Sequence, residues 1–321
     1  MSRVLPPEVP SSEIEDPSDP VGPDEGRSPI EEGGLGLLTT GTTGAGRRRR
    51  RRVAVWLAVG WLALVIGTAL LADLLPLEPY DRIVRSLPPR SPIGLRLDEP
   101  LGTDGFGRSM ASRLVYGARQ SLLIAVVAAS LAGAIGTVIG VVTGYMRGKV
   151  DETVGVLLDA LLAFPALVLL MAIASIGRRD VTTVIVALSV LGVPGFARVA
   201  RARTLALAER EFVMTARSMG ATTWRIMFRE ILPNLMPVLL SVMLLVLAAF
   251  IVAEGTLSFV GLGVPPPQPS WGGMINEGRQ SLRVAPQLIF TPAVCLVLTV
   301  MSFRVVGEWL GDRLDAGEGG R

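Results

Sequence analysis

The 321-residue chain contains no histidine, one cysteine and one lysine, and these scarcities exclude several kinds of chemistry. Without histidine, Ser-His-Asp and Cys-His catalysis and histidine metal centres are impossible. The single cysteine, Cys295, can form no intrachain disulfide. The surroundings of Lys149 do not fit the GxxxxGK[ST] pattern of a P-loop. We therefore expect no catalytic, cofactor or metal site in this chain, and any energy for its work comes from a partner or an ion gradient.

Charged residues are also scarce, at 18% of the chain against about 25% in average soluble domains. Half of the residues are hydrophobic, and they gather in runs of 16 to 25 residues with little or no charge. A helix needs roughly 20 apolar residues to cross a bilayer. The sequence thus predicts an all-α polytopic membrane protein with six spans, at about 53–72, 121–145, 154–177, 181–197, 235–253 and 288–306.

The two ends of the chain indicate how these spans are oriented. Residues 1–46 are acidic and rich in proline, and they contain no aromatic residue, which predicts a disordered cytoplasmic tail. Six consecutive arginines at 47–52 adjoin the first span. Because positive charge beside a span stays in the cytoplasm, this block predicts a topology anchor rather than a nucleic-acid contact. Six crossings through a domain at 53–315 return the tail at 316–321 to the same side, giving an N-in, C-in arrangement.

The segment 198–234, on the predicted cytoplasmic side, is long, charged and patterned as a helix. Four of its residues recur at i, i+4, i+7 and i+8 and predict a narrow apolar stripe. They are Phe212, Ala216, Met219 and Gly220, with Glu211 beside them. A second helical stretch is expected at 224–231, after a corner at Gly220. Two short helices of this kind predict a docking surface for a protein, because ordinary loops are shorter and carry no stripe.

Several local patterns predict how the spans bend and pack. The last four spans are each expected to bend or break at a proline, namely Pro165, Pro194, Pro237 and Pro292. The prolines at 265–269 predict a rigid ledge between the fifth and sixth spans. Residues 107–120 read as an interfacial helix lying on the membrane before the second span. A seam of small residues predicts close helix packing along that span. It consists of Gly133, Gly136, Gly140 and Gly144.

Two acidic residues lie inside or at the end of predicted spans, Asp159 in the third and Glu254 in the fifth. Ionisable groups in a bilayer are costly and commonly functional, so either residue is a candidate for lining or gating a path. Both lie near a membrane face in the predicted topology. Interfacial capping or an interhelical hydrogen bond therefore remains open as the alternative.

Four motifs, in order along the chain, resemble one family of bacterial transport proteins. The segment 209–220, followed by Ile231-Leu232-Pro233, resembles the EAA loop of ABC importer permeases. The stretches 101–108, 253–263 and 269–272 resemble the C-type permease of dipeptide, oligopeptide and nickel importers. The first of these supplies an outer-loop motif made of Gly102, Thr103, Asp104, Gly107 and Arg108. One departure is Met214, which stands where the family has an acidic residue.

The resemblance implies a six-helix type I importer permease in the bacterial inner membrane, forming half of a translocation path. It implies a second, B-type permease subunit, two ATPase subunits or domains that bind ATP and Mg, and an extracytoplasmic peptide-binding protein. In the family, the loop helix at 209–220 inserts into a groove of the ATPase. Two alternatives stay open: the same machinery importing nickel or another small solute, and a gradient-driven secondary carrier.

Overall fold

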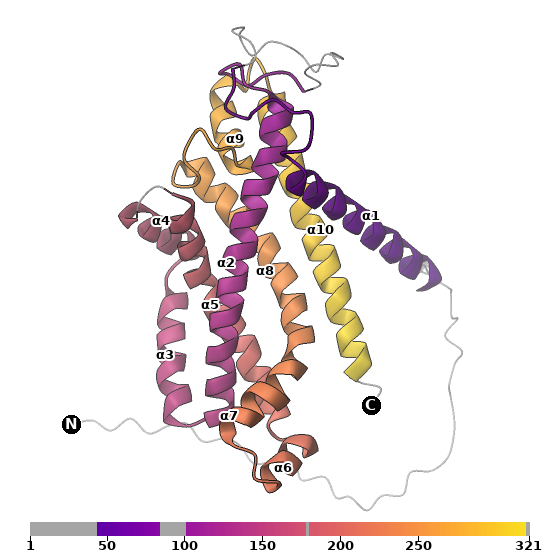
Figure 1. The fold of residues 1–321 in the computed structure, drawn as a ribbon, viewed down its shortest axis with the longest axis vertical. Coiled ribbons are helices and arrows are strands. Elements are labelled where there is room, and N and C mark those ends of the chain that lie inside the picture. The colour runs from indigo at the N-terminus through magenta and orange to yellow at the C-terminus, as the bar shows by residue number, and fades with distance from the viewer. Residues whose placement is uncertain (1–43, 84–100, 178–179, 319–321) are drawn as a thin grey trace, which may run out of the picture. The chain divides into compact units, whose positions relative to one another are not determined.

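The computed structural model describes residues 44–83, 101–177 and 180–318, which belong to one compact unit. The predicted tail lies outside these residues, apart from its last three. Figure 1 shows that the described part is built of helices. In chain order they are α1 (Gly44–Leu70), α2 (Met110–Met146), α3 (Lys149–Ala163), α4 (Ala166–Ile176), α5 (Val181–Leu207), α6 (Glu211–Ser218), α7 (Thr223–Arg225), the π-helical turn η1 (Ile226–Ile231), α8 (Leu232–Val260), α9 (Trp271–Gly278), the 3₁₀ turn η2 (Arg279–Ser281) and α10 (Gln287–Glu318).

The predicted all-α membrane architecture is confirmed. Five helical segments are long and apolar enough to cross a membrane, and α3 with α4 makes a sixth if the bent pair counts as one span. The two halves of this pair meet at 89°. Phe164 lies between them in an extended conformation, which is the conformation that a following proline imposes. The third predicted span is therefore broken at Pro165, as expected. The other three prolines break no span, because Pro194, Pro237 and Pro292 lie inside α5 (Val181–Leu207), α8 (Leu232–Val260) and α10 (Gln287–Glu318).

The interfacial helix predicted at 107–120 is wrong. From Met110 this segment is the first part of α2, a continuous helix of 37 residues that includes the second span. The helix begins at Ser109, whose side chain accepts a hydrogen bond from the Ser112 amide. Arg113, in the first turns, is buried in the protein. The polar residues of this stretch thus face other protein elements.

The glycine seam joins α2 closely to α5. An added Cβ atom at Gly136 would lie 2.6 Å from the carbonyl oxygen of Val193, and one at Gly140 would lie 2.4 Å from that of Ala197. Such contacts with backbone atoms are possible only for glycine, so the two helix backbones approach each other directly. The predicted seam is confirmed.

The start of α1 and the end of α10 lie on the same side of the helix bundle. Arg51, near the start of α1, pairs with Asp312, near the end of α10. The two helices also touch where the Trp61 indole donates a hydrogen bond of 3.0 Å to the Thr299 hydroxyl. The arginine block continues directly into the first span, because α1 already begins at Gly44. An even number of crossings requires both ends on the same side, in agreement with the predicted topology.

The second cytoplasmic helix, predicted to end before Pro233, extends further. α7, η1 and α8 run on as one helical segment from Thr223 to Val260. Pro233 lies in the first turn of α8, where the missing amide hydrogen interrupts no helical bond because η1 has altered the hydrogen-bond register. The loop after α6 is thus connected rigidly to a span.

Candidate functional site

The outer-loop motif forms a tight turn around Asp104. One carboxylate oxygen accepts hydrogen bonds from the backbone amides of Phe106 and Arg108, at 2.8 and 2.9 Å. The other accepts from Nε of Arg108 at 2.7 Å. Gly102 and Gly107 both have positive φ, 75° and 81°, a conformation that favours glycine. Thr103, also buried, forms a β-bridge with Ser109. All five predicted residues of the motif therefore belong to one structural element.

This turn belongs to a larger charged group, the outer charge cluster, made of Asp104, Arg108, Arg113 and Glu277. Glu277 on α9 accepts hydrogen bonds from Arg108 at 2.8 Å and from Arg113 at 2.9 Å. The Arg113 side chain is only 1% exposed and also lies 3.3 Å from Asp104. Two cations and two anions balance each other, which makes their burial tolerable. The cluster ties α9 to the start of α2.

A separate ion pair lies nearby, outside the spans. Arg119 and Tyr116 on α2 both bond the Asp73 carboxylate, at 2.7 and 3.0 Å. The hydrogen bond from Arg119, then that from Tyr116, lowers the pKa of Asp73 below its ordinary value. This contact fixes the chain that follows α1 against α2.

Glu254 lies at the centre of a buried hydrogen-bond network that we call the carboxylate network. Its side chain is fully buried and accepts hydrogen bonds from the hydroxyls of Ser121 at 2.9 Å and Ser258 at 2.7 Å. Ser258 accepts in turn from the Ser270 hydroxyl at 3.2 Å. The Trp271 amide donates to Ser121 at 3.4 Å. Glu254 thus makes the interhelical hydrogen bonds that were one of its two predicted roles.

The same network brings together two of the sequence motifs. Ser270 caps α9 by accepting from the Gly273 amide at 3.1 Å. An added Cβ at Gly272 would lie 2.4 Å from the Gly255 carbonyl oxygen, so α9 and α8 are in backbone contact. The Trp271 indole donates to the Leu114 carbonyl of α2 at 3.1 Å. The motifs at 253–263 and 269–272 therefore form one rigid junction at the outer end of α2.

Asp159, the other candidate for a path or gate, lies in a different setting. Its side chain is 67% exposed and pairs with Arg198 of α5, whose side chain is 57% exposed. A neighbouring pair joins Asp151 to Arg201. These contacts connect α3 with α5 on the outside of this subunit. A role of Asp159 in a path stays a prediction, since the surface it occupies would have to face a partner.

At the opposite end of the bundle, α6 contacts both η1 and the end of α2. The Arg217 guanidinium donates to the Tyr145 hydroxyl at 3.0 Å and lies 5.7 Å from the centre of its ring. Just outside the two helices, Arg147 pairs with Glu209 at 2.8 Å. Val213 is fully buried, Ala216 is nearly so, and α6 packs on η1. Movement of α6 therefore acts on η1, which continues into α8, and through polar contacts on the end of α2.

The residues predicted as one apolar stripe do not share a face. Phe212 and Met219 are exposed, Met219 to 77%, whereas Ala216 faces the bundle. The helix is only eight residues long, and tertiary packing uses Val213 and Ala216 as its inner face. Glu211 is in the first turn of α6 and exposed.

Gly220 ends α6 as predicted for a corner. Its φ is 79°, its amide donates to the Arg217 carbonyl, and the Ala221 amide donates to the Ala216 carbonyl. This is the Schellman pattern of helix termination, which favours glycine. The expected positive φ is confirmed.

An apolar surface, which we call the coupling patch, surrounds this corner. Trp224 is 62% exposed and its ring stacks on Phe228, with centroids 5.5 Å apart. The patch consists of Phe212, Met214, Met219, Trp224 and Phe228, all exposed. Several exposed apolar side chains on neighbouring short helices, two of them stacked, favour an interaction surface. Sequence reasoning included Phe212 and Met219 but missed the two aromatic residues, because their stacking crosses from α7 to η1.

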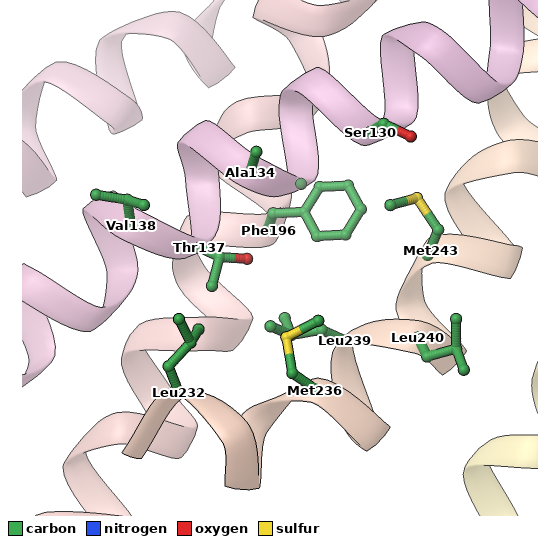
Figure 2. A pocket seen from close by; sticks show the side chains of 11 residues that line it. Ser130, Ala134, Thr137, Val138, Phe196, Leu232, Met236, Leu239, Leu240 and Met243 are labelled. Carbon is green, nitrogen blue, oxygen red and sulfur yellow. The ribbon is translucent and has the colours of Figure 1, made fainter. Parts of the chain in front are cut away.

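A cavity of about 420 Å³ opens between α2 and α8. Figure 2 shows its lining, five residues from each of these helices and Phe196 of α5 between them. All eleven lining residues are uncharged. From α2 they are Ser130, Gly133, Ala134, Thr137 and Val138, and from α8 Leu232, Met236, Leu239, Leu240 and Met243.

Residues 136–318 match the family of binding-protein-dependent transport system inner membrane components. The chain belongs to this family. The glutathione transport system permease protein GsiD of Escherichia coli O6:K15:H31 is 36% identical over 269 residues, 84% of this chain and 88% of the relative. Its Pectobacterium atrosepticum counterpart is 36% identical over 215 residues, 67% of this chain and 71% of the relative.

The fold is also found among solved structures. A chain of the MetNI methionine ABC transporter, in inward-facing conformations, aligns with a TM-score of 0.52 at 23% identity. The alignment covers 64% of this chain and 97% of that chain. The type I importer permease fold expected from the motifs is thereby confirmed. As an ABC importer permease subunit, the chain is a multi-pass protein of the bacterial inner membrane and is not itself an enzyme.

Two permease residues in these sites had no signal in the sequence. Glu277 lies 164 positions from Arg113, and Ser121 lies 133 positions from Glu254. Each is an ordinary polar residue within an apolar or loop segment. Only the assembled bundle shows that they complete charged and hydrogen-bonded groups.

Proposed function

We propose that this permease is one half of the translocation path of an ATP-driven importer of di- and oligopeptides. A second, B-type permease subunit supplies the other half, and two ATPase subunits bind ATP and Mg and dock on the cytoplasmic end. An extracytoplasmic binding protein delivers the peptide. The peptide substrate is supported by the relatives named as glutathione permeases, because glutathione is itself a small peptide.

The observation that carries coupling to an ATPase is the structure around α6. The coupling patch exposes apolar side chains, while α6 packs on η1, which continues into α8, and Arg217 bonds Tyr145 of α2. A surface that only bound a partner would need the patch alone. These contacts with two spans give the bound partner a means of moving them.

α2 extends this connection through the subunit. Its 37 residues correspond to about 55 Å of helix, from the contacts with α6 to the outer charge cluster. There Arg113 holds Glu277 of α9, and Trp271 is bonded to the Leu114 carbonyl. Movement of α6 on closure of the ATPase would therefore displace the outer junction, which is the linkage that alternating access needs.

The test uses the full complex in proteoliposomes, with binding protein outside and ATP inside. Gly220→Val places a β-branched residue at a φ of 79°, which is a severe backbone strain. We expect insertion and assembly to persist, and ATP hydrolysis to lose its response to loaded binding protein, with peptide uptake lost. Gly155→Val is the matched control, because a Cβ at Gly155 contacts nothing within 4 Å. Wild-type uptake by Gly220→Val would refute the coupling role.

The same vesicles distinguish the alternatives. Uptake of nickel or another small solute, with no uptake of any peptide, would replace the substrate but keep the mechanism. Uptake that follows an ion gradient and needs no ATP would indicate a secondary carrier. Replacement of Met214 by Glu, the residue that the family pattern has there, should be tolerated if the ATPase groove is of the usual kind.

A further inference from the structure

The pocket between α2 and α8 contains two hydroxyl groups that lack hydrogen-bond partners. Within the described part of the chain, the hydroxyls of Ser130 and Thr137 bond to no other group. Elsewhere in the long helices, Thr143, Ser189 and Thr256 bond to the carbonyl four residues earlier, at 2.7 to 2.9 Å. In the described residues, the buried hydroxyls of Thr204 and Ser241 also have no partner, but they lie outside the pocket. Figure 2 shows the Thr137 hydroxyl directed into the space that faces α8.

Free hydroxyls in an apolar setting have a physical cost. In a helix, a serine or threonine hydroxyl normally satisfies itself on the preceding turn. Ser130 is exposed and Thr137 is 8% exposed, and both open onto the pocket. Within a membrane, the apolar lining would not replace the bonds that these hydroxyls could make with water. Two of them, on one wall of one pocket, therefore favour a guest that brings its own donors and acceptors. A lipid acyl chain brings neither.

We propose that this pocket binds the peptide during translocation, with its backbone amides on Ser130 and Thr137 and an apolar side chain between Met236, Met243 and Phe196. This inference rests on the proposed function. The two hydroxyls are seven residues apart on α2, about 10 Å along a helix, which is about the length of three extended peptide residues. A small peptide is long enough to reach both.

The lining also predicts a preference among peptides. All eleven residues are uncharged, so an acidic or basic side chain entering the pocket would be desolvated without a counter-ion. Methionine side chains are flexible and accommodate apolar groups of different shape. The pocket therefore selects peptides with apolar side chains, of varied size, over multiply charged peptides, even when the binding protein delivers both.

The first test removes the hydroxyls and keeps the shape of the pocket. The double variant Ser130→Ala, Thr137→Val is assayed for ATP-dependent uptake of labelled Leu-Leu-Leu, which is long enough to reach both hydroxyls, in proteoliposomes with the whole complex. We expect uptake at low peptide concentration to fall by about fivefold for each hydrogen bond lost. Thr256→Val is the control, since Thr256 is bonded to its own helix and lies outside the pocket. Unchanged uptake by the double variant would overturn the inference.

The second test fills the pocket. Ala134→Phe places a ring in the cavity, whereas Ile135→Phe places the same ring at an exposed neighbour that does not line it. Ala134→Phe should reduce uptake of Leu-Leu at least tenfold more than that of Gly-Gly, while ATP hydrolysis in response to loaded binding protein continues. An equal loss of both peptides would show that the side chain does not occupy this pocket, and would overturn the inference.

Other occupants give different results. If a helix of the second permease fills the pocket, Thr137→Val lowers recovery of the heterodimer, and the inference fails. If a lipid fills it, Ala134→Phe changes thermal stability with the lipid composition and the double variant transports normally, and the inference also fails. Wild-type complex that hydrolyses ATP but takes up no peptide refutes the proposed substrate, and the pocket assignment with it. Peptide uptake with insensitive pocket variants refutes the assignment alone.

Discussion

Replacement of Glu254 by alanine tests whether the carboxylate network supports the outer junction. The carboxylate is the acceptor for Ser121 and Ser258, and both hydroxyls are buried. A buried hydroxyl left without a partner costs about 1–3 kcal/mol. Ser258 can turn to the carbonyl of residue 254, as helix hydroxyls commonly do, which recovers part of this cost. We expect Glu254→Ala to lower the free energy of unfolding by about 2–4 kcal/mol.

Glu254→Gln is the matched comparison. The amide keeps one acceptor oxygen and nearly the same volume, so the network is changed in one bond only. We expect a loss of about 1 kcal/mol. The loss measured for Glu254→Gln relative to wild type isolates the acceptor function, because this variant keeps the volume of the side chain.

The assay is thermal unfolding of the purified complex in mild detergent. For a chain of this size, each kcal/mol corresponds to about 3 °C, so Glu254→Ala should lower the midpoint by about 6–12 °C and Glu254→Gln by about 3 °C. A midpoint for Glu254→Ala within about 2 °C of wild type would refute the reasoning. Normal stability of Glu254→Gln with complete loss of uptake would assign Glu254 to the path or gate instead.

Three further outcomes follow from the contacts. Gly140→Ala places a Cβ 2.4 Å from a backbone oxygen and should destabilise the α2–α5 seam by about 1–3 kcal/mol, whereas Gly155→Ala, in open space, should be neutral or stabilising in the same melting assay. Glu277→Gln removes one counter-charge of the buried Arg113 guanidinium and should lower the free energy of unfolding by about 2 kcal/mol, after allowance for the partial exposure of Glu277. Glu277→Asp should not keep the wild-type stability, because the shorter side chain cannot reach both arginines. The pKa of Asp73 is lower in the folded protein than its ordinary value of 3.8. Its ion pair therefore stabilises the fold at pH values above 3.8, and this contribution is lost as the pH falls through the lower folded pKa. Asp73→Asn should reduce the drop in melting midpoint between pH 7 and about pH 3, and an unchanged pH profile would contradict this.

The sequence alone determined the features that depend on local properties. Run length and absence of charge indicate the spans, because a bilayer requires about 20 apolar residues whatever the rest of the chain does. The positive φ at Gly220 follows from backbone sterics within a few residues. A proline alone did not decide where a span breaks, because Pro165 ends a helix whereas Pro194, Pro237 and Pro292 lie inside helices. The motif order was enough to indicate the permease family.

Tertiary structure decided which polar residues face protein and which face solvent. Residues 107–120 have the sequence pattern of an interfacial helix, but in the structure Asp104 and Glu277 form ion pairs with Arg113. These ion pairs stabilise the Arg113 charge, so that this part of α2 can be buried. In α6, packing of Val213 against the bundle turns Ala216 inward and leaves Met219 exposed. These outcomes depend on contacts between residues more than a hundred positions apart, or on which face a neighbouring helix covers. The free energy of a buried charge is set by its partner, and only the folded chain supplies that partner.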